Sequence, residues 1–299
     1  MPKTVADLRA LMGDLPCPDQ PISCKVLKVE DRDTFYLERL VLDLNGYEPV
    51  PALFMRPKGG KGPYPAVLFN HSHGNLFHIG KTELLDGCEY MLKRGYAYDL
   101  AERGIAALCI DHMCFEDRSG LTESYVYKKL IWDGYVMWSW MVYDSLRALD
   151  YLCMREDVDS MRIATIGMSM GSTMAQWVAA LDGRIKVCVD ICCMTNFDEL
   201  LRENRLDQHG IYYYVPGLHR AFGVADINAL IAPRAHLSIA GTFDPHTPLK
   251  GLEKDNKQLC RVYEECGKPQ NWCQKLYPIG HTETYEMRFD VLAFLNEHL

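Results

Sequence analysis

Residues 162–171 read Arg-Ile-Ala-Thr-Ile-Gly-Met-Ser-Met-Gly, an apolar run that ends in the pattern Gly-x-Ser-x-Gly. The run from Arg162 to Ile166 predicts a buried strand, and the residues after Ser169 predict the start of a helix. A serine on such a tight turn has its hydroxyl forced out above the sheet. Small residues are needed at both ends because side chains there would collide with neighbouring backbone. The N–H groups at the helix start would face a developing oxyanion, so the stretch predicts a serine nucleophile for acyl transfer.

Short apolar runs alternate with helical stretches over most of the chain, which is typical of a mostly parallel sheet covered by helices. We expect its strands at 66–70, 105–111, 162–167, 185–191, 236–241 and 273–278. The first part of the chain predicts a short helix or arm at 4–15 and antiparallel strands at 25–30, 36–44 and 50–56. A turn-rich stretch, 58–65, closes that region.

With 299 residues, 48% of them hydrophobic, the chain is long enough to bury one large core, so we expect a single domain over 1–299. Within it, 1–64 forms the arm and the antiparallel strands. The pattern breaks down at 195–232, which we place as an insertion after the sixth strand. Such an insertion lies where ligands bind in open α/β sheets, which would make it a lid; a surface excursion packed by its tyrosines fits the pattern equally well, and an interface is also open.

The longest predicted helix starts near Asp133, which we expect to be its N-cap. Apolar residues recur along it every three to four positions: Val136, Trp140, Tyr143, Leu146, Leu149 and Cys153. That face should pack on the sheet.

A serine hydroxyl needs a base within hydrogen-bond reach, and the base needs an orienting carboxylate. His281 follows the last predicted strand, and Gly280 before it would allow a tight turn. Asp244 stands just beyond the strand at 236–240, in a loop stiffened by prolines. The three residues follow one another along the chain in the order serine, acid, histidine, which is typical of the α/β fold that carries its nucleophile on a Gly-x-Ser-x-Gly turn. Asp198 is the alternative acid, although a turn or N-cap role explains it more simply.

The N–H of Met170, with that of Asn75 or Gly74 in the loop after the first parallel strand, is expected to form an oxyanion hole. His71, His73 and His78 could imitate a metal site, but no acidic residue or cysteine nearby completes a ligand set, so we expect neither a metal nor a cofactor. Structural ion pairing is the expected role of Asp111 and of 116–118.

A formal charge of −8 without a dense lysine and arginine cluster argues against a nucleic-acid partner and favours a small uncharged ester as substrate. Residues 1–7 lack a basic segment followed by an apolar run, and no apolar stretch is long enough to span a bilayer. Many of the twelve cysteines lie in apolar runs and none forms a Cys-x-x-Cys pair. We therefore expect reduced thiols in a cytoplasmic protein, with no membrane partner; self-association stays open.

At these residues the chain resembles the α/β-hydrolase superfamily, and most closely its dienelactone-hydrolase-like and acetyl-xylan-esterase-like branch. The resemblance runs from about Pro65 to the end. It rests on the elbow and on the stretches 155–163, 231–234, 241–248 and 280–281. It implies a twisted, mostly parallel sheet with helices on both faces, cofactor-free hydrolysis of carboxylic esters, and Ser169, Asp244 and His281 as the matching triad.

Two residues depart from the family pattern. Ser169 stands where dienelactone hydrolases proper carry cysteine, which favours an ordinary esterase, and Ser172 stands where many relatives have a second glycine. A peptidase of the prolyl-oligopeptidase type and a non-catalytic binding protein of the same fold are the rival functions. Specificity in this fold lies in loops, here mainly 115–133 and 195–232.

Overall fold

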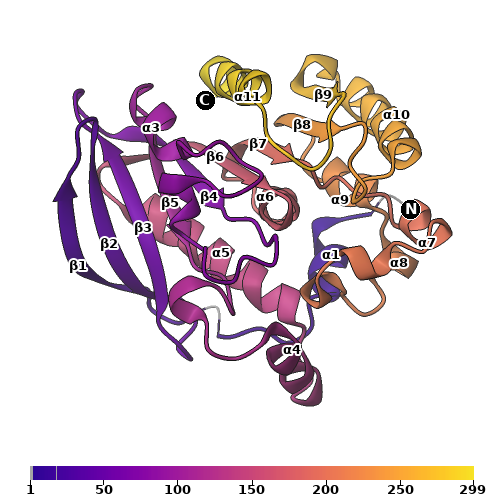
Figure 1. The fold of residues 1–299 in the computed structure, drawn as a ribbon, viewed down its shortest axis with the longest axis horizontal. Coiled ribbons are helices and arrows are strands. Elements are labelled where there is room, and N and C mark those ends of the chain that lie inside the picture. Colours follow the sequence, from indigo (N-terminus) through magenta and orange to yellow (C-terminus); the bar gives the residue numbers. More distant parts are fainter. Residues whose placement is uncertain (1–2, 18) are drawn as a thin grey trace.

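The computed structural model describes residues 3–17 and 19–299, which build a nine-stranded sheet at the centre of the molecule (Figure 1). The strands lie in the order β1-β2-β3-β5-β4-β6-β7-β8-β9. Their bounds are β1 (Ser23–Asp31), β2 (Phe35–Asp43), β3 (Val50–Pro57), β4 (Tyr64–Asn70), β5 (Ala106–Ile110), β6 (Val158–Met168), β7 (Ile185–Ile191), β8 (Ala235–Gly241) and β9 (Trp272–Tyr277). The pairs β1–β2, β2–β3 and β3–β5 are antiparallel, and the other five pairs are parallel. This confirms the predicted mostly parallel sheet.

Helices cover both faces of this sheet, as predicted. On one face lie α1 (Val5–Ala10), α5 (Met137–Met154) and α6 (Met170–Leu181); on the other lie α2 (Glu83–Asp86), α3 (Tyr96–Ala101) and α11 (Tyr285–His298). In β4, Ala66 and Leu68 pack toward the first group, whereas Val67 and Phe69 pack toward the second. Burial on both faces explains why the central strands are continuous apolar runs in the sequence.

The prediction for the long helix was wrong at its start. Asp133 ends a separate helix, α4 (Glu123–Trp132), and its N–H donates to the carbonyl of Lys129. Gly134 then takes a positive φ of 85°, which breaks the helical path, and α5 begins only at Met137. The buried stripe of α5 is also rotated from the predicted one, since it includes Met141, Ala148 and Leu152, while Leu146 and Cys153 are half-buried.

The insertion follows β7, the seventh strand along the chain, and not the sixth as predicted. It holds α7 (Phe197–Arg202), η2 (Leu206–Gln208), η3 (Ile211–Tyr213), α8 (Leu218–Ala221) and α9 (Val224–Ala229). Figure 1 shows α7, α8 and α9 on the side of the molecule where β8, β9 and α10 (Leu249–Glu265) lie. Two further short turns are η1 (Glu116–Arg118) and η4 (Pro269–Asn271). Within the described ranges, no helix is both long and apolar enough to cross a bilayer.

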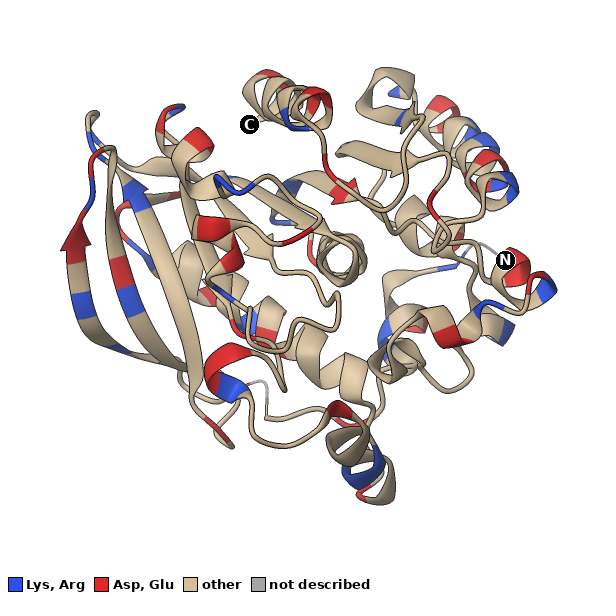
Figure 2. Ribbon diagram, viewed as in Figure 1, with Lys and Arg blue, Asp and Glu red and all other residues tan. Residues whose placement is uncertain are grey.

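Charges of both signs are interspersed along the strands and surface helices (Figure 2). Some charged side chains are buried. The buried ammonium of Lys81 donates to Asp111 (2.8 Å), Glu116 (2.7 Å) and the exposed Asp117 (2.8 Å). Burial alone would lower the pKa of Lys81, but the three carboxylates outweigh it and hold that pKa above its usual value. The predicted structural role of these acidic residues is confirmed, and Arg118 likewise pairs with buried Asp144.

We expect Lys81→Met to destabilise the protein by about 3–5 kcal/mol, because it leaves the fully buried carboxylate of Asp111 without a cation. Urea unfolding followed by circular dichroism would measure the loss. Lys129→Met is the matched control, since that lysine pairs with Asp133 on the exposed face of α4 and its removal should leave the unfolding midpoint unchanged. An unchanged midpoint in Lys81→Met would contradict the structural role of the buried group.

Candidate active site

Ser169 lies on a sharp turn between β6 and α6, with a φ of 57° that non-glycine residues rarely adopt. A Cβ added to Gly167 would lie 2.1 Å from the carbonyl oxygen of Gly171, and one added to Gly171 would lie 2.0 Å from the carbonyl oxygen of Asn70. The structure therefore confirms that backbone crowding demands glycine on both sides of this serine.

Because of that crowding, Gly171→Ala should destabilise the fold by about 3 kcal/mol, as the new methyl group would push α6 away from β4. Chemical denaturation gives the size of the loss. Gly183→Ala serves as the control because a Cβ at Gly183 meets nothing within 4 Å. If both variants unfold at the same denaturant concentration, the steric argument is wrong.

The loops after β8 and β9 bring Asp244 and His281 together. His281 Nδ1 lies 2.7 Å from Asp244 Oδ2, while Asp244 Oδ1 accepts the backbone N–H of His246 at 2.8 Å. The two loops approach closely at Gly241, where a Cβ would lie 2.4 Å from the carbonyl oxygen of Gly280. The chain does turn tightly here, since the N–H of Thr282 donates to the carbonyl oxygen of Gly280 at 3.0 Å, but Gly280 has no positive φ and room for a Cβ, so the turn does not require glycine.

The alternative acid, Asp198, does not reach this site. It is exposed in the first turn of α7 and pairs with His219 at 3.0 Å. The N-cap of α7 is Asn196, whose side chain accepts the N–H of Glu199. Of the two predicted acids, only Asp244 therefore contacts His281.

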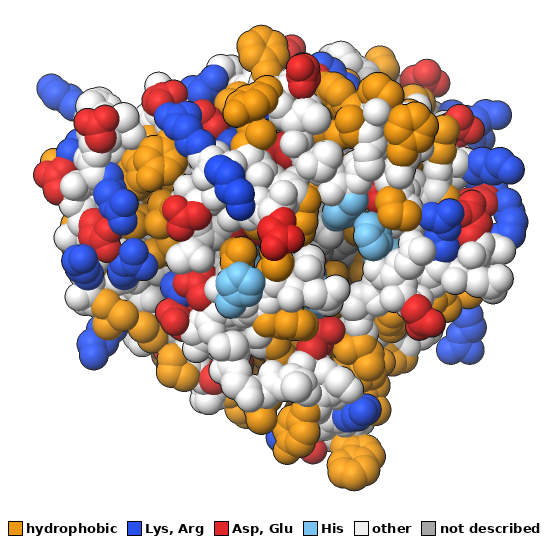
Figure 3. Space-filling view, in the orientation of Figure 1, with side chains coloured by type: hydrophobic (Ala, Val, Ile, Leu, Met, Phe, Trp, Pro, Cys, Tyr) orange, Lys and Arg blue, Asp and Glu red, His pale blue; other side chains and the backbone are white. Residues whose placement is uncertain are grey.

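Ser169 and His281 line one cavity of about 420 Å³ at the carboxyl ends of the strands. Its other described walls come from the loop after β4, from Tyr90 and Cys193, from the insertion and from His246: His73, Gly74, Asn75, Tyr90, Cys193, Asp207, Gln208, His209, Gly210, Tyr212 and His246. No lysine or arginine is among these described lining residues, and Asp207 is the acidic side chain among them. Histidine side chains gather at a hollow on the face shown in Figure 3.

Burial keeps several cavity groups uncharged. It lowers the pKa of His209 to about 4 and also lowers the pKa of His246, whose ring centroid lies 4.7 Å from that of His281. Burial raises the pKa of the Cys193 thiol to about 11. Near neutral pH this cysteine is therefore protonated and a weak nucleophile, although it lies in the same cavity as Ser169.

The candidate oxyanion donors fall at two places in the structure. Met170 is the first residue of α6, where helix N–H groups have no partner within the helix. Gly74 and Asn75 form a turn with φ values of 48° and 58°. The N–H of Asn75 donates to His73 Nδ1 at 3.1 Å, whereas the N–H of Gly74 makes no hydrogen bond within 3–17 and 19–299.

The histidines near that turn point to separate partners. His71 Nδ1 contacts the carbonyl oxygen of Ser72 at 2.8 Å, and His71 Nε2 accepts the N–H of His112 at 3.0 Å.

Two sets of three side chains elsewhere lie close enough to share a metal ion: Cys192, Asp244 and His281, and Asp111, Glu116 and Asp117. In the second set the ammonium of Lys81 already contacts all three carboxylates.

Sequence reasoning missed Tyr90, which connects the loops on the two sides of the cavity. Its hydroxyl donates to Ser72 Oγ at 2.6 Å, and its carbonyl oxygen accepts the N–H of Glu283 at 2.8 Å. Glu83 in turn accepts the N–H of Ser72 at 3.0 Å, and burial raises the pKa of Glu83 to about 7. Tyr90 lies in an irregular stretch without periodicity, so no sequence signal marked it. His246 was closer to detection, since it follows Asp244 by two residues.

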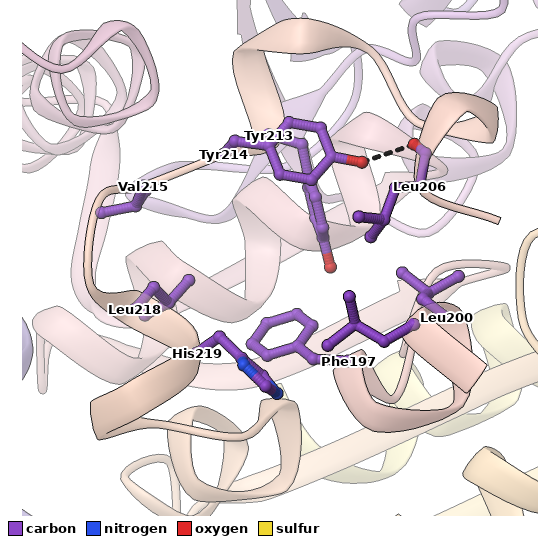
Figure 4. A pocket seen from close by; sticks show the side chains of 9 residues that line it. Phe197, Leu200, Leu206, Tyr213, Tyr214, Val215, Leu218 and His219 are labelled. Carbon is purple, nitrogen blue, oxygen red and sulfur yellow. Dashed lines mark hydrogen bonds between the residues drawn. The ribbon is translucent and has the colours of Figure 1, made fainter. Parts of the chain in front are cut away.

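The insertion also encloses a second, apolar pocket of about 160 Å³, shown in Figure 4. Its walls come from α7, η3 and α8 and include Phe197, Leu200, Tyr213, Val215 and Leu218. The ring of Tyr213 stacks on His209 with centroids 4.9 Å apart, and His209 lines the first cavity. The residues 207–210 and Tyr212 thus form one wall of the polar cavity, and the apolar pocket lies on the other side of this wall.

The chain matches known proteins over most of its length. The family model described as acetyl xylan esterase (AXE1) matches residues 26–208. A protein of Bacillus subtilis (strain 168), named "Putative hydrolase YtaP", is 46% identical over 289 residues, which cover 97% of this chain and 96% of that protein.

Solved structures share the fold at low sequence identity. A glucuronoyl esterase from Solibacter usitatus superposes with a TM-score of 0.74 at 15% identity, covering 98% of this chain and 91% of its own. An acetyl xylan esterase from Paenibacillus sp. R4 gives a TM-score of 0.61 at 18% identity, covering 99% and 93%. Together with the family match, the nine-stranded sheet and the serine turn, these results lead to one conclusion. The chain belongs to the acetyl xylan esterase family and is a carboxylic ester hydrolase of the α/β-hydrolase fold.

Proposed function

We propose that the protein cleaves small, uncharged carboxylic esters through a serine acyl-enzyme, with Ser169 as nucleophile, His281 as base and Asp244 as orienting acid. The observation that carries this proposal is the 2.7 Å contact between His281 Nδ1 and Asp244, with His281 and Ser169 lining one cavity. A carboxylate at Nδ1 leaves Nε2 free to take a proton, which is the tautomer that a base for serine requires.

In the proposed mechanism, Ser169 Oγ attacks the ester carbonyl carbon while His281 Nε2 takes the hydroxyl proton. Asp244 stabilises the resulting imidazolium, and the N–H groups of Met170 and Gly74 hold the oxyanion. We choose Gly74 over Asn75 because the Asn75 N–H is already bonded to His73. The imidazolium then protonates the departing alcohol. Water, deprotonated by His281, attacks the acyl-enzyme, the carboxylic acid leaves, and Ser169 regains its proton.

The cavity lining supports an uncharged and polar substrate. Histidine, tyrosine, asparagine and glutamine side chains offer hydrogen bonds, whereas the described lining has no cation for an anionic substrate and has one carboxylate, Asp207, that repels it. The polar walls would also bind a long alkyl chain poorly. We therefore propose a short acyl group, such as acetyl, on a polar alcohol.

A series of p-nitrophenyl esters from acetate to octanoate, run beside an acetylated sugar, tests the function. We expect the highest kcat/KM on acetate, a steep fall with chain length, and release of acetate from the sugar. Activity that rises toward octanoate would overturn the short-acyl assignment. Cleavage of aminoacyl p-nitroanilides with none of any ester would overturn the esterase proposal in favour of a peptidase, and failure of a fluorophosphonate to label Ser169 would indicate a binding protein.

A further inference from the structure

Glu123 and His73 form a second carboxylate–imidazole pair beside the cavity, separate from Asp244 and His281. His73 Nε2 lies 2.9 Å from Glu123 Oε1, and the two side chains are only 9% and 11% exposed. Glu123 is the first residue of α4, where the helix dipole favours a negative charge. None of the residues 115–133 lines the described cavity, so this segment reaches the site through the contacts that Glu123 and Phe115 make with His73.

The hydrogen bonds of His73 define its tautomer. Nδ1 accepts the N–H of Asn75 at 3.1 Å, so Nδ1 carries no proton, and the proton must lie on Nε2, where it is donated to Glu123. With the other tautomer, an N–H would point at the N–H of Asn75 and the bond would be lost. The carboxylate of Glu123 therefore holds the imidazole in the form that binds the turn.

The turn held in this way is strained. Gly74 and Asn75 both have positive φ, a conformation that costs energy for asparagine and persists only where surrounding contacts enforce it. Position 74 also excludes a side chain, because a Cβ there would lie 2.4 Å from the hydroxyl oxygen of Tyr90. The acceptor at His73 Nδ1 is thus a contact that fixes the N–H groups of this turn relative to Ser169.

The ring of His73 is itself fixed on its other sides. It stacks on Tyr212 of the insertion, with centroids 5.1 Å apart and planes inclined by 24°, and meets the edge of Phe115 at 5.2 Å. Gly210 lies so close that a Cβ there would be 3.1 Å from His73 Nε2. Contacts from α4, from the insertion and from the turn therefore meet at one imidazole.

We propose that His73 and Glu123 are positioning residues for ester hydrolysis: Glu123 fixes the tautomer of His73, and His73 holds the Gly74–Asn75 turn so that the Gly74 N–H faces the oxyanion. This inference rests on the proposed function. It assigns a positioning role to the first residue of α4, a helix that projects from the body of the molecule in Figure 1 and lies within the segment 115–133 that was expected to carry specificity. Neither side chain transfers a proton to the substrate in this role.

Two variants of His73 separate hydrogen bonding from packing. His73→Phe keeps a flat ring against Tyr212 and Phe115 but removes the acceptor, whereas His73→Asn places a carbonyl oxygen near the position of Nδ1. We expect kcat on p-nitrophenyl acetate to fall by about 10- to 100-fold in His73→Phe, with KM within threefold, because an oxyanion contact acts in the transition state. His73→Asn should recover most of that loss.

The same logic applies to Glu123. Glu123→Ala should lower kcat by about tenfold. Glu123→Gln should restore kcat because the amide oxygen can accept from Nε2–H of His73. The double variant His73→Phe with Glu123→Ala should have the same kcat as His73→Phe alone. Binding of a trifluoromethyl ketone, which forms a tetrahedral adduct with the serine, should weaken by the same factor as kcat. If the two residues had only a structural role, the variants would lower the thermal unfolding midpoint, and the loss of inhibitor affinity would not match the loss of kcat.

Several outcomes would overturn the inference: wild-type kcat in His73→Phe, a change confined to KM, or additive losses in the double variant. Ser169→Ala, assayed in parallel, distinguishes a failure of the proposed function from a failure of the positioning role alone. If Ser169→Ala remains active, the proposed function itself is wrong. If Ser169→Ala is inactive and labelling of the His73 variants by a fluorophosphonate proceeds at the wild-type rate, only the positioning role is wrong.

Discussion

Replacing Ser169 with alanine lowers kcat/KM on p-nitrophenyl acetate by about 10⁴-fold or more, because no other group at the turn can form the acyl-enzyme. The neighbouring thiol of Cys193 does not compensate, since burial raises its pKa to about 11 and keeps it protonated. Alanine fits the position sterically because it removes only the hydroxyl oxygen, although the φ of 57° stays unfavourable for it.

The measurement needs a folded variant and a matched control. Circular dichroism and the thermal unfolding midpoint establish folding, and Ser172→Ala, three residues along α6 and buried away from the cavity lining, should keep most of the activity. Residual turnover in Ser169→Ala at more than about 1% of wild type, with no wild-type contamination, would show that another residue attacks the ester.

The second large effect is expected for Asp244→Asn, which should lower kcat by about 10³- to 10⁴-fold with little change in KM. An amide that keeps the hydrogen bond from the His246 N–H to its oxygen presents an NH₂ group to His281 Nδ1. That contact favours the imidazole tautomer whose proton lies on Nε2, which cannot take the proton of Ser169. The loss of negative charge also destabilises the imidazolium.

Asp198→Asn is the matched control, since that carboxylate is exposed on α7 and pairs with His219 instead of His281. It should retain wild-type kcat. Near-normal activity in Asp244→Asn, or a comparable loss in Asp198→Asn, would mean that the orienting acid has been misassigned. Stopped-flow measurement of p-nitrophenol release would show whether acylation is the step that slows.

Much of the fold was predictable because its signals are local. Burial on both faces makes the parallel strands continuous apolar runs, so β7 was predicted at its observed bounds and β4, β5, β8 and β9 within about two residues. The error at α5 arose because Asp133 can cap either end of a helix in a sequence pattern, and only the backbone at Gly134 shows that one helix ends there. The placement of the insertion after the sixth strand was a miscount, because the strand predicted at 185–191, directly before the insertion, is already the seventh along the chain.

The sequence by itself determined the parts of the site that depend on neighbours along the chain. The glycines around Ser169 are required by backbone atoms within the same turn and the adjoining strand, and the acid and histidine follow directly on strand ends. These constraints act over a few residues and therefore leave a readable pattern.

Only the tertiary structure decided which distant groups share the cavity. The strand order places β4 between β5 and β6, so the turn at Gly74 comes beside Ser169, although about a hundred residues separate them. The pairing of His73 with Glu123, of Tyr90 with Ser72 and of Lys81 with three carboxylates joins segments without periodic signals. Such contacts depend on direction and distance in space, and a hydrogen bond imposes no spacing on the sequence that carries its two partners.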